Sequence, residues 1–160
     1  LWTAETPYLY TLVMRTLSPL GRSIDQNGPK MKVISDVEAC RVGVRTVKIF
    51  GQRLRVNQEP IIIQGVNRHE HCPKHGKAVT KQSMLQDVIM MKRYNFNAVR
   101  TSHYPNHPRF YDLCDEHGLY VCDEANMETH GFNVGLHPTP FLSNDPRWRL
   151  AHIARVARMI

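Results

Sequence analysis

The chain has 160 residues, of which 42% are hydrophobic and 22% charged, an ordinary globular composition that excludes disordered and low-complexity classes. Its net charge of +7 makes nucleic acid a candidate partner, but the basic residues are scattered, so we expect no nucleic-acid partner. No apolar run approaches the roughly 20 residues that span a bilayer, so we expect a soluble protein with no membrane partner. The one local concentration of basic side chains is expected to be a solvated helix face and comprises Arg147, Arg149, Arg155 and Arg158.

The cysteines show no Cys-x-x-Cys pair; they are Cys40, Cys72, Cys114 and Cys122. Free thiols in a reducing compartment are the favoured interpretation, although four cysteines would allow three disulfide pairings. The first residues also lack the charged-then-apolar layout of a signal peptide. Together these features predict a cytoplasmic location.

Residues 1 to about 50 are expected to be rich in β-strand. Tyr8, Tyr10, Leu12 and Met14 alternate with Leu9, Thr11, Val13 and Arg15. A polar loop follows at 21–29, and an extended pattern resumes from Met31. Val47 and Ile49 then face Leu54 and Val56 across the turn residues 50–52, which predicts a hairpin. This half resembles part of a β-sandwich.

From Pro60 onward the pattern predicts strands that alternate with helices. The expected elements are a strand at Ile61–Ile63 buried on both faces, a helix at Lys81–Tyr94, a strand at Phe96–Arg100, a helix between Pro108 and Gly118, a buried strand at Leu119–Cys122, and a third helix that begins at Asp145-Pro146 and carries an apolar stripe. Polar clusters follow each predicted strand, as on the catalytic face of a (β/α)8 barrel or in the crevice of an open parallel sheet. Three such units cannot close a barrel of eight, so we expect the chain to be a piece of a larger protein.

The first polar cluster runs from Asn67 to His75. It is not the His-Glu-x-x-His zinc helix, because Pro73 occupies the place of the second His. His69 and His71 are two residues apart and could share a metal on an extended segment. A surface loop that is simply rich in His explains the pattern equally well.

The second cluster runs from Asn97 to Pro105. Arg100 at a strand end can hold a carboxylate through two parallel hydrogen bonds, and His103 can donate to or accept from a hydroxyl. A structural ion pair and a capping His are the alternatives. Pro105 stiffens the turn, so we expect the His103 imidazole to be positioned.

The third cluster runs from Asp123 to Gly131. Glu128 and His130 are spaced i, i+2 and face the same way on an extended segment. One carboxylate and one imidazole suit a divalent cation that still needs a third protein ligand. Asp123 and Glu124 are expected to orient neighbours or to pair with Arg.

Taken together, these motifs resemble glycoside hydrolase family 2. The signature-like residues are Asn97-x-Val-Arg100-Thr-Ser-His103-Tyr-Pro105, then Phe110-Tyr111, Asp115 and Gly118-Leu-Tyr-Val. Three further stretches are similar to the β-galactosidase branch of that family: Leu1-Trp2-Thr-Ala-Glu-Thr-Pro7-Tyr-Leu-Tyr10, Gly65-Val-Asn-Arg-His-Glu-His71 and Glu128-Thr-His130-Gly131.

The resemblance implies a retaining β-galactosidase that cleaves terminal β-D-galactosides such as lactose. It implies an α/β fold in which residues 1–46 end an immunoglobulin-like β-sandwich and 47–160 form the first three βα units of a (β/α)8 TIM barrel. Glu128 and His130 would ligate Mg²⁺, His69 and His103 would contact sugar hydroxyls, and Arg100 would orient the nucleophile. A homo-oligomer and a bound Na⁺ belong to the same set of expectations.

By the same resemblance, no catalytic carboxylate lies within the 160 residues. The family's acid/base Glu, which is also the third Mg²⁺ ligand, and its nucleophile Glu would both lie beyond Ile160. We therefore expect this chain on its own to hydrolyse no galactoside. Three departures from the family pattern are Cys122 in place of an aliphatic residue, Cys72 in place of a His, and a longer loop at 132–144, which bears on substrate size.

Three alternatives stay open at this point. Thr101-Ser-His-Tyr-Pro105 also resembles the β-glucuronidase branch, although Glu128-Thr-His130 argues against it. His69-x-His71 would be the first metal pair of a zinc amidohydrolase. A non-catalytic carbohydrate-binding protein or complementing fragment would hold a sugar with these residues without cleaving it.

Overall fold

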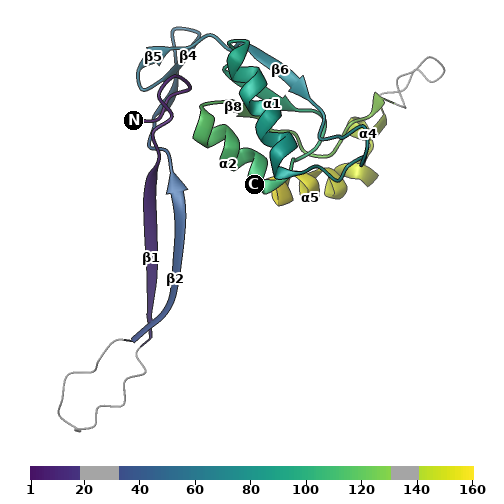
Figure 1. The fold of residues 1–160 in the computed structure, drawn as a ribbon. Helices are drawn as coiled ribbons and strands as arrows, with labels where there is room; N and C mark the ends of the chain where they lie inside the picture. The colour runs from purple at the N-terminus through teal and green to yellow at the C-terminus, as the bar shows by residue number, and fades with distance from the viewer. Residues whose placement is uncertain (19–32, 131–140) are drawn as a thin grey trace.

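The computed structural model describes residues 1–18, 33–130 and 141–160 (Figure 1). Strands β1 (Tyr10–Ser18) and β2 (Val33–Val42) form an antiparallel hairpin, in which Tyr10 pairs with Val42. This agrees with the predicted β-rich first half. Figure 1 shows the hairpin projecting away from the helices, and its strand side chains are exposed, Leu12 by 47% and Val13 by 49%. The predicted loop at 21–29 and the start at Met31 lie outside the described residues.

The predicted hairpin after Thr46 is confirmed. Strands β3 (Val47–Phe50) and β4 (Arg53–Val56) pair antiparallel, with Val47 opposite Val56 and Ile49 opposite Leu54, and β5 (Glu59–Pro60) adds to β4. The two turn residues, Gly51 and Gln52, have φ values of 56° and 62°. Two successive positive φ angles match the right-handed twist of the strands, which explains why a turn with Gly closes this hairpin.

The predicted buried strand at Ile61–Ile63 is wrong. The first parallel strand is β6 (Gly65–Arg68), and Ile62 and Ile63 are 78% and 52% exposed. The Asn97 side chain takes the place of a neighbouring strand here, since it donates to Ile62 O (2.8 Å) and accepts from Gln64 N (2.8 Å). Residues 61–64 therefore form a connector between two sheets, and its backbone is bonded partly by the Asn97 side chain and partly by main-chain groups such as Leu54 O and Asn97 N.

Helices α1 (Lys81–Arg93) and α2 (Pro108–His117) lie close to their predicted positions. Thr80 and Ser83 form a reciprocal capping box at the start of α1. Pro108 is the first residue of α2, where its missing N–H costs no hydrogen bond, and Gly118 ends the helix with a φ of 77°.

Strands β6, β7 (Ala98–Thr101) and β8 (Tyr120–Cys122) form the parallel sheet, with β7 in the middle. Arg100 pairs with Asn67 on one side and with Cys122 on the other. β8 is half-buried to exposed and so differs from the buried strand that we predicted, because it lies at the edge of the described sheet. All three strands point the same way, so the loops that follow them meet at one edge.

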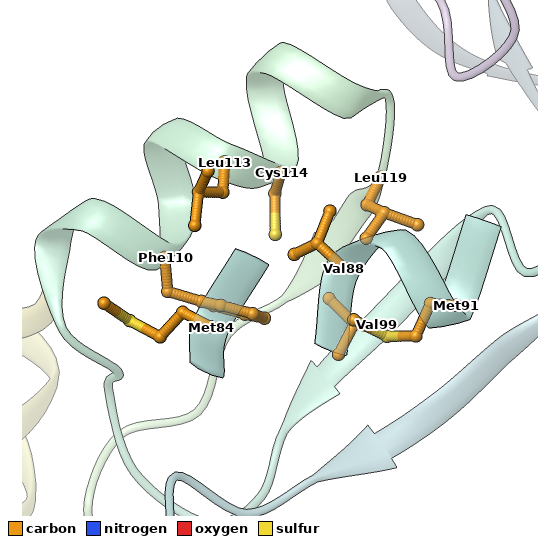
Figure 2. Packing of buried hydrophobic residues seen from close by; sticks show 8 residues of the cluster. All are labelled: Met84, Val88, Met91, Val99, Phe110, Leu113, Cys114 and Leu119. Carbon is orange, nitrogen blue, oxygen red and sulfur yellow. The ribbon is translucent and has the colours of Figure 1, made fainter. Parts of the chain in front are cut away.

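The core lies between α1, α2 and one face of this sheet (Figure 2). Its buried members are Met84, Val88, Met91, Val99, Phe110, Leu113, Cys114 and Leu119. Burial raises the pKa of the Cys114 thiol to about 12, so Cys114 is a packing group at neutral pH. All four cysteines are free, as predicted.

The N-terminal segment packs against the amino ends of the parallel strands. Trp2 is 1% exposed, donates from Nε1 to Asp115 O (2.9 Å) and meets the Tyr120 ring edge-on at 5.5 Å. Lys92 Nζ donates to Ala4 O (2.9 Å) and Gly118 O (3.0 Å). These contacts close the end of the sheet opposite the polar loops.

The third predicted helix is confirmed, with a first turn that is a 3-10 helix. Asp145 accepts a hydrogen bond from Arg147 N (2.9 Å), η1 spans Pro146–Trp148 and α5 spans Arg149–Met159. A short helix that we did not predict, α4 (Phe141–Asn144), precedes it. The four Arg side chains of this region are exposed, as expected for a solvated face. No helix in the described ranges has both the length and the apolar character required to cross a membrane.

Candidate active site

An ion-pair network joins the carboxyl ends of β7 and β8. The Arg100 guanidinium donates from Nε to Glu124, and His103 Nδ1 lies 2.8 Å from the other Glu124 oxygen. Arg100 NH1 reaches Asn67 Oδ1 at the end of β6, at 3.3 Å. One carboxylate thus holds the guanidinium and the imidazole together, and the prediction that Glu124 pairs with Arg is confirmed.

The charge of Glu124 is stabilised by these partners. Desolvation acts to raise the pKa of its carboxyl group, but the hydrogen bonds from His103 and Arg100 outweigh desolvation and lower the pKa below its usual value of 4.5. The group is therefore a carboxylate at neutral pH and acts only as a hydrogen-bond acceptor.

Asp123 supports the network through hydrogen bonds. This agrees with the prediction that it orients its neighbours. Its Oδ1 accepts from Thr101 Oγ1 (2.6 Å) and from the Tyr111 hydroxyl (2.8 Å), and Thr101 Oγ1 also accepts from Glu124 N (3.2 Å). Burial, together with the bond to Asp123, raises the pKa of Tyr111 above its usual range. The phenol therefore keeps its proton and ties α2 to the end of β8.

His69, at the end of β6, lies beside His103. The two imidazole rings meet edge to face, with centroids 5.4 Å apart. His69 Nδ1 is 3.3 Å from the Tyr104 hydroxyl, which also receives a hydrogen bond from Glu70 N (3.1 Å) and one from Lys77 Nζ. The structure thus brings His69 together with Arg100 and His103, from two separate stretches of the sequence.

Sequence reasoning missed Arg68, which holds the end of β6 in place. Its side chain is 7% exposed, lies 4.1 Å above the Phe110 ring and donates to Asp87 (2.9 Å) and Asn106 (2.6 Å). No spacing in the sequence pointed to Arg68, because its partners Asp87 and Asn106 lie on other parts of the chain, and a buried charge of this kind needs such partners.

Glu128 and His130 line a cavity of about 650 Å³ with Arg100 and His103. Val156 and Met159 of α5 form part of its wall, and Arg155 of α5 donates to Asn126 O (2.9 Å) in the loop before Glu128. Four of the five predicted site residues therefore face one cavity, and the fifth, His69, contacts His103 at its side.

The carboxylate of Glu128 and the imidazole of His130 fit part of a cation site. Both side chains are exposed toward the cavity, and Glu128 Oε1 accepts only a 3.0 Å hydrogen bond, from His130 N, among the contacts of the described residues. Carboxylate oxygen is a ligand that Mg²⁺ prefers. Within residues 1–18, 33–130 and 141–160 no group of three or more His, Cys, Asp or Glu is arranged to hold a metal. The pair can supply two ligands, and further ligands would have to come from elsewhere.

The same finding bears on the pair His69-x-His71. Both residues line a shallow groove of about 380 Å³ beside β6, with Asp87 among its other residues. His69 is engaged with Tyr104, and the described residues offer no third ligand. The geometry does not favour a zinc site there.

Comparisons with known proteins agree on one family. The family described as "Glycosyl hydrolases family 2, TIM barrel domain" matches residues 47–160. A β-galactosidase of Vibrio vulnificus (strain YJ016) is 50% identical over 99% of this chain, and a β-galactosidase of Enterobacter cloacae is 48% identical over 100% of it. The chain spans 14% of the length of each of these relatives.

Solved structures of β-glucuronidases are also similar. The Ruminococcus gnavus β-glucuronidase matches with a TM-score of 0.78 and 29% identity, over 100% of this chain and 25% of that one. The Dictyoglomus thermophilum β-D-glucuronidase matches with a TM-score of 0.82 and 26% identity, over 100% of this chain and 26% of that one.

Proposed function

Since the chain belongs to glycosyl hydrolase family 2, we propose that it is part of a retaining β-galactosidase that releases terminal β-D-galactose from substrates such as lactose. The observation that carries the proposal is the set of side chains at one cavity, in which Arg100, His103, Glu128 and His130 face the same space. The β-galactosidases that are about half identical over the chain add to it.

We propose that residues 1–46 end an immunoglobulin-like sandwich and that 47–160 form the first three βα units of the barrel. The family match begins at Val47, which supports this boundary. The order β6, α1, β7, α2, β8, followed by a further helix, is that of successive βα units around a parallel barrel.

In this proposal the chain binds the sugar and orients the nucleophile, while the two carboxylates that break the glycosidic bond lie outside it. Retaining hydrolysis needs an acid/base and a nucleophile with their carboxyl groups about 5 to 5.5 Å apart. Arg100 uses Nε on the Glu124 carboxylate and NH1 on the Asn67 amide, and the remaining N–H groups of its guanidinium can hold a second carboxylate, the nucleophile. His69 and His103 would bond sugar hydroxyls, most strongly in the transition state.

Glu128 and His130 would hold Mg²⁺ in the same cavity. A bound cation there would supply positive charge that offsets the negative charge of nearby carboxylates. The residues of this chain contribute one carboxylate oxygen and one imidazole nitrogen. Their exposure toward the cavity leaves both atoms accessible.

The test is hydrolysis of a nitrophenyl β-galactoside by the whole protein that carries this chain. We expect turnover with the galactoside, a loss of at least about tenfold in kcat/KM for Glu128→Gln, and partial recovery of that variant at high Mg²⁺. Glu38→Gln, which changes an exposed carboxylate on β2, is the matched control and should retain full activity. Sugar binding without turnover would instead support a non-catalytic carbohydrate-binding protein.

A β-glucuronidase is the second candidate, because solved β-glucuronidases resemble the chain over its whole length. A glucuronide carries a carboxylate that needs a cation of its own. At this cavity Arg100 is paired with Glu124 and, in this proposal, also holds the nucleophile, so it is not free for that carboxylate. This favours the neutral galactoside. Faster turnover of the nitrophenyl β-glucuronide than of the galactoside would reverse this choice.

The 160-residue chain by itself is expected to be inactive, since the two carboxylates would be missing. Purified chain incubated with the nitrophenyl galactoside should release no nitrophenol. Turnover that Glu128→Ala abolishes would refute this expectation.

A further inference from the structure

The Tyr104 hydroxyl has three hydrogen-bonding neighbours, and their chemistry determines where its proton goes. Glu70 N–H and the Lys77 ammonium can only donate. They occupy the two acceptor sites of the phenol oxygen, and Lys77 also lies 3.9 Å above the Tyr104 ring. The phenol proton is then left for the third neighbour, His69 Nδ1, at 3.3 Å.

This assignment sets the tautomer of His69. A neutral imidazole that accepts at Nδ1 carries its own proton on Nε2. His69 therefore offers a ligand an N–H donor. Tyr104, which accepts a hydrogen bond from Lys77, acts on His69 through this contact.

His103 is held the opposite way. Its Nδ1 lies 2.8 Å from a Glu124 oxygen, and a carboxylate can only accept, so Nδ1 carries the proton. Arg100 NH2 approaches the same nitrogen at 3.3 Å, but the contact with the carboxylate is shorter and assisted by charge. Neutral His103 therefore offers a ligand a bare Nε2 acceptor.

We propose that Tyr104 and Glu124 hold the adjacent imidazoles of His69 and His103 in opposite tautomers, so that the pair recognises two sugar hydroxyls with opposite hydrogen-bonding roles. One hydroxyl accepts from His69 and the other donates to His103. The proposal rests on the proposed glycosidase function for the identity of the ligand. Tyr104 and Glu124 are positioning residues, because they act through the imidazoles.

Neutron diffraction from crystals of the whole protein at neutral pH tests the tautomers directly. The expected result is hydrogen on Nε2 of His69 and on Nδ1 of His103. Hydrogen on Nδ1 of His69, or on Nε2 of His103, would overturn the proposal. These positions do not depend on turnover, so a protein with the expected tautomers that neither binds nor cleaves galactosides would contradict the proposed function alone.

Binding of modified galactoses tests the recognition. Fluorine accepts weakly and cannot donate, so a fluoro group should be tolerated better than a deoxy group at the hydroxyl facing His69. At the hydroxyl facing His103 both should bind equally poorly. Tyr104→Phe should remove the preference for fluoro over deoxy at the first position and raise KM by about fivefold, the size expected for one neutral hydrogen bond.

A control variant and a second positioning variant separate positioning from a general structural effect. Tyr94→Phe changes a tyrosine that is 74% exposed and should leave both the KM and the fluoro preference unchanged. Glu124→Gln replaces an acceptor by an amide that can also donate. It should therefore reduce the preference for a hydroxyl over a fluoro group at the position that faces His103. A Tyr104→Phe protein that keeps the full fluoro preference would contradict the proposal.

Discussion

The two ends of the parallel sheet are held by different kinds of contact. At the amino end, Trp2 and Lys92 donate to main-chain carbonyls, those of Asp115, Ala4 and Gly118. At the carboxyl end the bonds run mainly between side chains, as in the network of Arg100, His103 and Glu124. Main-chain partners are present in any sequence, whereas side-chain partners must each be specified. Substitutions at the first end should therefore affect stability, and those at the second should also affect ligand recognition.

Trp2→Ala should have the largest effect. Loss of a fully buried indole costs about 3–5 kcal/mol of unfolding free energy, and chemical denaturation of the whole protein would measure it. Trp148→Ala is the matched control because Trp148 is 43% exposed. Sugar affinity of the folded Trp2 variant should be unchanged, and a specific loss of affinity would break the distinction between the two ends.

Gly118→Ala should cost about 3 kcal/mol of unfolding free energy, the upper end of what a strained backbone position costs. Gly118 has a φ of 77°, and a Cβ there would lie 2.2 Å from Ala4 O. Gly51→Ala shares the positive φ, 56°, but meets nothing within 4 Å, so it should cost about 1 kcal/mol from backbone strain alone. Equal midpoints of denaturation for the two variants would show that the close approach at Gly118 contributes nothing.

Tyr111→Phe tests the carboxyl end and should cost about 2 kcal/mol. The phenol donates to Asp123 (2.8 Å) and accepts from Asn106 N (2.7 Å), and the variant leaves both groups with one partner fewer. Thermal unfolding would measure the loss, with the exposed Tyr94→Phe as control. We also expect weaker sugar binding, because Asp123 supports Thr101 and thereby Glu124. A loss of stability with unchanged affinity would show that Tyr111, like the residues at the amino end of the sheet, affects stability alone.

Glu124→Gln should have the smallest effect on stability, and that effect should depend on pH. The pKa of Glu124 is lower in the folded protein than its usual 4.5, so its charge stabilises the fold above pH 4.5 and this contribution is lost as the pH falls through the lowered value. The difference in melting temperature between wild type and variant should therefore shrink on acidification. A difference that is constant from pH 7 to pH 3 would contradict the ion-pair network.

Local sequence signals were sufficient to predict the elements that have strong caps or turns. Pro108 and Gly118 bracket α2 in the sequence as in the structure, and the turn at Gly51 closes the predicted hairpin. These positions depend on backbone conformations that only a few residue types favour. The apolar run at Ile61–Ile63 led to the wrong prediction of a buried strand, because burial depends on neighbouring elements. Here the neighbour is the side chain of Asn97.

The convergence of the site followed from topology once the strands were expected to be parallel. Arg100, His103, Glu128 and His130 were all placed after such strands and line one cavity. Tyr104 and Arg68 could not be assigned in advance. Tyr104 and His69 are 35 residues apart, and Arg68 and Asn106 are 38 apart. Sequence spacing carries no information about such contacts.

The chemical groups that gather at the carboxyl edge of the sheet can be read from the sequence alone, because the order of strand, polar loop and helix is local and the strands run in parallel. Which of those groups touch, and in what hydrogen-bonding role, depends on the packing of the whole fold, as for the imidazoles of His69 and His103 beside Tyr104 and Glu124. The two kinds of information differ in range along the chain. Backbone preferences act over a few residues, whereas a hydrogen bond between side chains depends on the packing that brings distant segments to within about 3 Å of each other.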